Sequence, residues 1–361
     1  MTEQFSLRIV IEELITQNLL KSSDQTKIAD SLKSNSDEPD TPWFVSVLIG
    51  VSAWIAVIPF IGFLAAMDLL QSPLSAIVLG ILLIIGTVVL HLFPKKSLFI
   101  NQLALALNLT GQILFIFGIG GKTKNVAIAA LAAWFLEILL ISFYRDGIIR
   151  FLGVIFATIA AIVLLYDFKL YQGIHALIVL LAAGAVWYWI AEPNHLTNEI
   201  MASLYKPLGY GFVIALQTIL LFSILPEAKV IPIISWWYST IGLVVVLLLL
   251  EYHLLYVNNR PISSKESMAI IIGSLIVALL LYQSPGIIAA IIVLLLGFQR
   301  GNRVLMGLSL IFLTVFFVAF YYHLNITLLM KSMTLMSAGL VLLMLRFVFK
   351  YVFPLSKGEQ L

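Results

Sequence analysis

The sequence contains no cysteine and very few charged residues. Of its 361 residues, 11% are charged and 61% are hydrophobic, whereas a soluble domain of this size carries about 25% charged and about 45–50% apolar residues. The absence of cysteine excludes disulfides, thiol chemistry and cysteine-ligated metals. The shortage of charge excludes a water-soluble fold, and a formal net charge of +3 is too small to indicate nucleic-acid binding.

Long apolar runs fill most of the chain, separated by short polar or Pro/Gly segments. Helices satisfy their own backbone hydrogen bonds in lipid, so the runs predict an all-α, polytopic transmembrane helix bundle of about 12 spans. The ninth and tenth runs are short and could instead form a re-entrant or tightly turned hairpin. The predicted spans lie near residues 43–66, 74–92, 98–119, 126–143, 148–166, 171–191, 208–225, 233–257, 268–282, 285–298, 304–322 and 327–345.

Three regions follow from this pattern. Residues 1–42 are predicted to be a polar tail with a short amphipathic helix, residues 43–353 the transmembrane domain, and residues 354–361 a second tail. Sixteen of the 21 Lys and Arg residues fall on the side of both tails and five on the other. Because positive residues stay in the cytoplasm, both termini are predicted to be cytoplasmic. Connections this short leave no room for a soluble catalytic domain, so we expect no enzyme.

A faint repeat runs through the chain. Phe143-Tyr-Arg145, followed by Tyr166, parallels Phe298-Gln-Arg300, followed by Tyr322, six spans later. The pattern predicts a possible six-plus-six repeat, as parallel repeats are known in transporters. Apolar sequences also align by chance, and that alternative stays open.

One acidic residue interrupts the fourth predicted span. Glu137 lies about eleven residues into it, near the bilayer centre. An ionised carboxylate at that depth costs about 2.5–3.5 kcal/mol on insertion scales, so Glu137 should be protonated, paired or facing a wet cavity. The third predicted span carries Asn101, Asn108 and Gln112 at helical spacing, on one face.

These residues form the candidate polar site in the membrane. Asn108 and Glu137 lie equally far from the short connection between their spans, so we predict a hydrogen bond between them, provided that the polar face of the third span turns toward the fourth. The acid and the amides could relay protons or coordinate a cation. Alternatively, a protonated Glu137 joins two helices, as polar residues in membranes commonly do. Glu192, His195 and Glu199 share one helical face and could hold a divalent ion, but without a fourth ligand a solvated turn is the interpretation we adopt. We expect no metal, cofactor or catalytic site.

The C-terminal third resembles a known family. The residues that carry the resemblance are Phe298-Gln-Arg300-Gly-Asn-Arg303 and the stretch from Tyr321-Tyr322 through Thr327 to Lys331-Ser332, with Pro42-Trp43-Phe44-Val45 as the entry segment. The family consists of bacterial multi-span inner-membrane proteins known only as a domain of unknown function. Its members are often accompanied by a second membrane protein named for a Gly-Asp-Tyr-x-x-Leu-x-Tyr motif.

The resemblance implies location and a possible partner but no activity. It implies the bacterial cytoplasmic (inner) membrane, a helical fold, the lipid bilayer as surroundings and a second envelope membrane protein as partner. It also groups Arg300, Arg303, Tyr321, Tyr322, Thr327 and Lys331 into a candidate family module, although Lys331 could simply be an anchor that reaches the headgroups. We therefore predict a structural or regulatory subunit with a membrane partner. The alternative is a permease or channel that uses Glu137 and the polar stripe of the third span.

Overall fold

The computed structural model describes residues 43–67, 72–92, 98–144, 146–195, 199–224, 237–282 and 284–323, with scattered positions between 329 and 347. Over these ranges the regular structure is entirely helical, which confirms the predicted all-α class. The helices are α3 (Trp43–Ala66), α4 (Pro73–Leu92), α5 (Leu98–Thr123), α6 (Val126–Phe143), α7 (Gly147–Asp167), α8 (Gly173–His195), α9 (Glu199–Ile224), α10 (Trp237–Val257), α11 (Lys265–Leu280), α12 (Pro285–Arg300) and α13 (Arg303–His323).

These eleven helices of the described chain overlap the first eleven predicted spans in order. The predicted tail 1–42 with its amphipathic helix, most of the twelfth span and the tail 354–361 lie outside the described residues. Within the described ranges, six helices are long and apolar enough to cross a membrane, namely α4 to α8 and α10, and α3, α9, α12 and α13 contain shorter apolar stretches. The chain is therefore a multi-span membrane protein.

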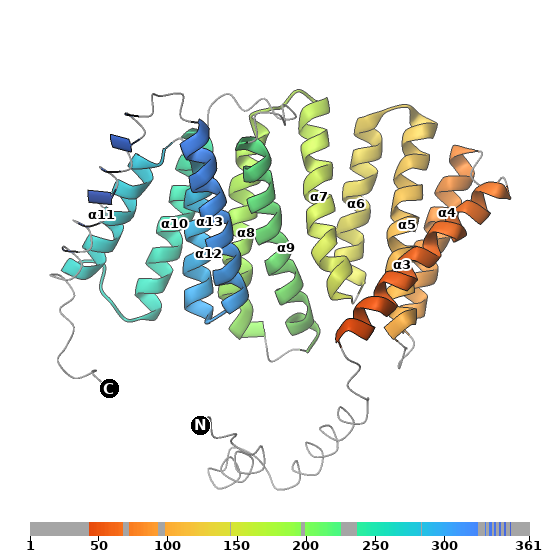
Figure 1. The fold of residues 1–361 in the computed structure, drawn as a ribbon, viewed down its shortest axis with the longest axis horizontal. Coiled ribbons are helices and arrows are strands. Elements are labelled where there is room, and N and C mark those ends of the chain that lie inside the picture. Colours follow the sequence, from red (N-terminus) through yellow and green to blue (C-terminus); the bar gives the residue numbers. More distant parts are fainter. Residues whose placement is uncertain are drawn as a thin grey trace, which may run out of the picture.

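Apart from α3, which runs obliquely across its neighbours, the helices stand side by side with roughly parallel axes, and successive helices run in opposite directions (Figure 1). Helices α3 and α4 lie at one end of the row and α11 at the other. We call the side on which α3 begins the tail side and the opposite side the far side. Helices α6 and α10 both end on the tail side (Figure 1), so depth can be compared between them.

Ordinary capping signals set several helix ends. The side chain of Asn125 accepts a hydrogen bond from Ile128 N at the start of α6, and that of Asp146 accepts bonds from the first residues of α7. Gly301 ends α12 with a φ of 59°, the left-handed conformation that glycine adopts without steric cost. These signals are local, but the sequence-based boundaries are uneven. Helix α7 is predicted from residue 148 and begins at Gly147, whereas α9 is predicted from residue 208 and begins at Glu199.

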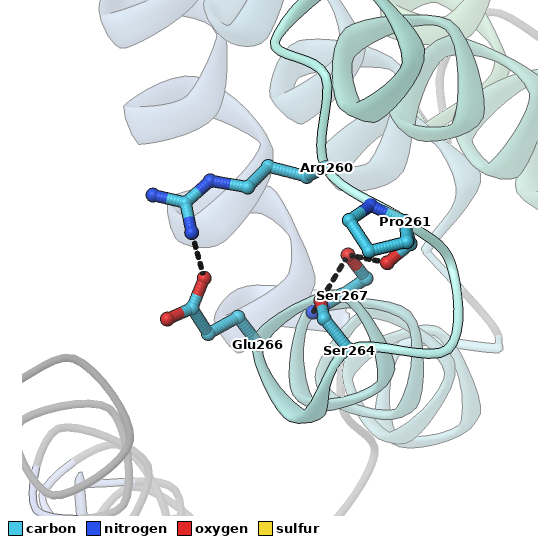
Figure 2. Close-up of polar contacts among 5 residues, drawn as sticks. All are labelled: Arg260, Pro261, Ser264, Glu266 and Ser267. Atoms are coloured by element: carbon cyan, nitrogen blue, oxygen red, sulfur yellow. Dashed lines mark hydrogen bonds and ion pairs between the residues drawn. The ribbon is translucent and has the colours of Figure 1, made fainter.

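The connection between α10 and α11 is held by its own polar contacts (Figure 2). Ser264 caps α11 by accepting from Ser267 N, and the Ser267 hydroxyl donates to the Pro261 carbonyl over 2.9 Å. Arg260 and Glu266 form an ion pair of 2.6 Å at the surface, and such exposed pairs contribute little stability. The turn keeps α11 beside α10, its main neighbour.

The ninth and tenth predicted spans are two separate helices with different surroundings. Helix α11 lies at the end of the row (Figure 1) and exposes most of its apolar side chains. Helix α12 packs against α8, α9, α10 and α13 and is buried along most of its length. Both have 16 residues, so length alone does not distinguish a peripheral helix from a central one.

Two hydrophobic cores share α7. The larger core is built mainly from α8, α9, α10 and α12, and it includes Val154 of α7. The smaller one joins α4, α5, α6 and Ile149 of α7. Large apolar side chains are exposed along every helix except α9, whose described side chains include none, as expected for helices that face lipid. Helix α7 is therefore the element that connects the two halves of the row.

Helices α4 and α5 approach each other through glycine. A Cβ on Gly80 would lie 2.7 Å from the Gly111 carbonyl oxygen, and one on Gly118 would lie 2.8 Å from the Pro73 carbonyl oxygen. No side chain fits at such distances, so the two backbones touch. Small residues at crossings of this kind are a common means of helix association in membranes, where van der Waals contact replaces the hydrophobic effect.

Candidate functional site

The polar stripe of α5 faces α4. The Asn108 side-chain amide donates to Thr87 Oγ1 over 2.8 Å and accepts, through Oδ1, from Gln112 Nε2 over 2.9 Å. The Thr87 hydroxyl donates onward to the Ile84 carbonyl. Asn108 is fully buried, and Thr87 and Gln112 are each 3% exposed. The stripe is thus a hydrogen-bonded connection between two helices that already touch through glycine.

The predicted hydrogen bond between Asn108 and Glu137 is wrong. Asn108 uses its amide on Thr87 and its carbonyl on Gln112, while neither oxygen of Glu137 has a hydrogen-bond partner. The equal spacing of Asn108 and Glu137 from the turn gave no information on which neighbour the polar face of α5 would meet. The glycines of α4 and α5 decide that question, because they turn this face toward α4.

Asn101 does not join this network. It lies in the first turn of α5 and its side chain is exposed, so the face predicted from helical spacing is buried only from Ala104 onward. Tyr144 closes the network at the tail side, where its hydroxyl makes a long hydrogen bond of 3.5 Å to the Thr87 carbonyl. Burial raises the pKa of Tyr144 to about 12, so it remains a hydrogen-bond donor at ordinary pH.

Glu137 lies at the interface of α6 and α7. Its side chain is 1% exposed, and a Cβ built on Gly153 of α7 would lie 3.2 Å from Glu137 Oε2. The same Cβ would lie 2.8 Å from Ile141, one turn along α6. The carboxyl group therefore occupies the space left by the missing side chain of Gly153, between apolar neighbours. Buried polar groups almost always have a partner, so this arrangement is unusual.

Sequence reasoning missed a second buried acid. Glu251 of α10 is 5% exposed and accepts a short hydrogen bond from the Ser274 hydroxyl of α11. Glu137 and Glu251 each lie six residues before the last residue of their helix, which places both about 9 Å from the tail side. An acid inside the predicted span 233–257 was the signal that could have found Glu251.

Two further buried polar groups were not predicted. Gln217 of α9 is fully buried, and neither of its amide atoms has a hydrogen-bond partner. His175 of α8 lies 2.6 Å, through Nδ1, from the hydroxyl of Ser239 of α10, and Ser239 is also fully buried. This pair connects α8 to α10.

Arg300, from the candidate family module, holds the end of α8. Its guanidinium donates to the carbonyl oxygens of Trp189 and Ile190, each over 2.6 Å. Pro193 follows Trp189 by four residues, and proline has no N–H to donate to that carbonyl. The Arg300 side chain therefore replaces a backbone donor that the sequence of α8 removes.

Asn302 adds to the contacts made by Arg300, and we call these two residues together the clamp. Its side-chain oxygen accepts bonds from the first residues of α13, and its amide donates to the Tyr210 hydroxyl of α9 over 2.7 Å. The turn between α12 and α13 is thereby joined to both α8 and α9. The segment from Arg300 to Asn302 thus has a structural role at the tail side, which the sequence alone did not reveal.

The rest of the candidate family module is not brought to that clamp. Arg303 is exposed at the start of α13, and Tyr321 and Tyr322 lie in its last turn. Thr327 and Lys331 lie outside the described residues, so the grouping of these residues stays a prediction. In the described part of the chain, no three His, Asp or Glu side chains are arranged to hold a metal ion.

Comparison with protein families gives one match. The family described as "Domain of unknown function (DUF4401)" matches residues 42–352, which is most of the chain. The chain belongs to the DUF4401 family. This agrees with the resemblance found on the C-terminal residues and with a multi-span membrane protein. Neither the curated proteins nor the solved structures contain a match to the chain.

Proposed function

We propose that this DUF4401 protein is a structural or regulatory subunit of a bacterial inner-membrane complex. It would have about twelve spans and both termini in the cytoplasm. The observation that carries the proposal is that the polar stripe on α5 is packed against α4. Asn108 and Gln112, which would line a transport path in a permease, are buried and hydrogen-bonded within the α4–α5 contact.

Other buried polar side chains support the same role. Ser274 bonds to Glu251 between α11 and α10, His175 pairs with Ser239 between α8 and α10, and Arg300 holds the end of α8. Each contact joins two helices. Hydrogen bonds between membrane helices typically contribute about 0.6 kcal/mol and at most about 1.7 kcal/mol. Together they favour a fixed helix arrangement, which suits a scaffold.

The charges along the chain support the proposed topology. Arg150, Lys206, Arg260, Lys265, Arg300 and Arg303 lie toward the tail side, whereas Lys122, Lys124 and Lys169 lie toward the far side (Figure 1). A cytoplasmic tail side agrees with the positive-inside rule. The second membrane protein implied by the family resemblance is the proposed partner.

The second candidate function is a permease or channel. One observation favours it, namely that Glu137 is buried in the membrane without a hydrogen-bond partner. Intramembrane acids of this kind mark proton or ion pathways in many transporters. A pathway would also need water at Glu137, and the polar stripe of α5 does not extend to it.

Site-specific photo-crosslinking in native membranes tests the proposal. A crosslinkable residue replaces one exposed apolar side chain at a time, namely Phe117 of α5, Phe135 of α6, Leu180 of α8 or Leu279 of α11, all more than 60% exposed. A subunit should give one discrete adduct from adjacent positions and none from the others. The proposal fails if no position gives an adduct and the purified protein alone moves a solute in liposomes, with loss of transport in Glu137→Gln.

A further inference from the structure

We infer that Glu137 is a proton-binding site within the membrane, located at the contact between α6 and α7. The inference does not depend on the proposed function, because a subunit and a permease could both contain such a site. The inference starts from the Glu137 carboxyl group, which takes no part in the helix-joining hydrogen bonds described above. Glu137 is 1% exposed and neither of its carboxyl oxygens has a hydrogen-bond partner.

The surroundings of the carboxyl group are apolar and narrow. It lies against the backbone of α7 at Gly153, with Ile141 on the same side. A Cβ on Gly153 would come within 3.2 Å of Glu137 Oε2 and 2.8 Å of Ile141. Gly153 therefore provides the space that the carboxyl group occupies, and little more.

A proton is the ligand that fits this space. An ionised carboxylate is strongly disfavoured where neither water nor a hydrogen-bond donor reaches it, whereas a neutral carboxyl is tolerated. Calcium takes six to eight oxygen ligands, and magnesium requires octahedral coordination. The described residues contain no cluster of three acidic or histidine side chains, so Glu137 could supply only one ligand of a metal ion.

The charged groups of α5 and α7 lie near the ends of these helices. Helix α7 carries one cation, Arg150, which is 1% exposed and lies three residues before Gly153. Asp146 caps α7 at the tail side, and on α5 the nearest charge along the helix is Lys122, near the far side. Exchange is expected with the tail side, about 9 Å away.

Infrared spectroscopy of the full chain in phosphatidylethanolamine and phosphatidylglycerol vesicles tests the site. A protonated carboxyl has a C=O stretch that is separate from the carboxylate bands, and its frequency is higher when the group accepts no hydrogen bond. Wild type at neutral pH should show such a high-frequency band, and Glu137→Gln should remove it. Glu251→Gln is the matched control, because Glu251 lies at the same depth but accepts a bond from Ser274.

Glu251→Gln should leave the high-frequency band in place. Raising the pH should convert this band into carboxylate absorption, which shows that the proton exchanges. The inference is overturned if Glu137→Gln removes only carboxylate absorption at neutral pH, or if the band resists every pH at which the protein stays folded. Neither result bears on the crosslinking experiment, so the two proposals can fail separately.

A second measurement uses the wild-type protein, so it tests the site even if Glu137→Gln fails to fold. Dicyclohexylcarbodiimide dissolves in lipid, and a protonated carboxyl adds across its N=C bond to form an O-acylisourea, which rearranges to a stable N-acylurea. The reaction is an addition followed by an acyl shift, so it needs no oxidant, reductant or leaving group. Peptide mass spectrometry of labelled wild type should place the adduct on Glu137, with less labelling as pH rises. A labelled Glu251 beside an unlabelled Glu137 would contradict the site.

Discussion

The contact between α6 and α7 and the contact between α10 and α11 each contain one buried acid. Glu137 and Glu251 lie equally far from the tail side, on helices that run in the same direction. Glu251 accepts a bond from Ser274 on the neighbouring helix, whereas Glu137 faces the bare backbone of Gly153. Depth and residue type are the same, so the neighbouring helix decides whether the acid joins two helices or remains available for a proton.

The largest effect is expected where α7 leaves room for the acid. Gly153→Leu should lower the free energy of unfolding by about 1–3 kcal/mol, because the new side chain meets Ile141 and Glu137 in a contact already filled. Unfolding of the purified protein in detergent, followed by circular dichroism, measures the change. Gly307→Ala is the control, because its Cβ would meet nothing within 4 Å. Equal stability of Gly153→Leu and wild type would refute the tight packing at Gly153.

Arg300 extends the comparison of the two acids to a cation that has hydrogen-bond partners. Arg300→Ala should cost about 1–3 kcal/mol, because the Trp189 carbonyl loses its donor and Pro193 cannot replace it. The same detergent unfolding assay applies. Arg303→Ala, which removes an exposed side chain three positions later, should change stability by less than about 0.5 kcal/mol. If both variants behaved alike, the role of the clamp would be disproved.

Leucine substitution should change protein stability differently at the two acids. Glu251→Leu should lower stability by about 1 kcal/mol, because the Ser274 hydroxyl loses its acceptor. Glu137→Leu should leave stability unchanged or raise it, because it removes a buried polar group without a partner. Thermal unfolding of both variants gives the answer. A larger loss for Glu137→Leu would mean that the acid has a bonding role after all.

The smallest effect is expected in the polar stripe. Asn108→Leu should cost about 0.6 kcal/mol and no more than about 1.7 kcal/mol, the range found for hydrogen bonds between membrane helices. The Asn108→Leu, Thr87→Val double-mutant cycle should show that the two losses are not additive, since the residues bond each other. Asn101→Leu, at an exposed position, should have no effect. Strict additivity of the pair would count against the bond.

Much of the fold could be predicted from the sequence, because its signals are local. Apolar runs predict the helices, and in the structure Asn125, Asp146 and Gly301 mark helix ends. It is harder to predict which helices are buried among other helices and which lie at the edge. Helices α11 and α12 have equal length and similar composition, yet only α12 is central, because in lipid hydrophobicity does not indicate which side of a helix faces protein.

The candidate site could be predicted only in part, because its geometry depends on which helices meet. Helical spacing grouped Asn108 with Gln112 correctly, since both lie on one helix. The partner of Asn108 is set by Gly80 and Gly111, whose approach turns the stripe toward α4. That information lies in a pair of glycines 31 residues apart, and no local pattern connects them.

Thiol accessibility tests most directly whether the α5 stripe is a packed contact. The chain has no cysteine, so each single-cysteine variant carries one reactive group. Asn108→Cys and Gln112→Cys are treated with a charged maleimide in sealed vesicles, with exposed Lys122→Cys as the reactive control and lipid-facing Phe117→Cys as the unreactive one. We predict that both stripe positions stay unlabelled from either side. Labelling of Asn108→Cys and Gln112→Cys at the rate of Lys122→Cys would show a water-filled path and contradict the account.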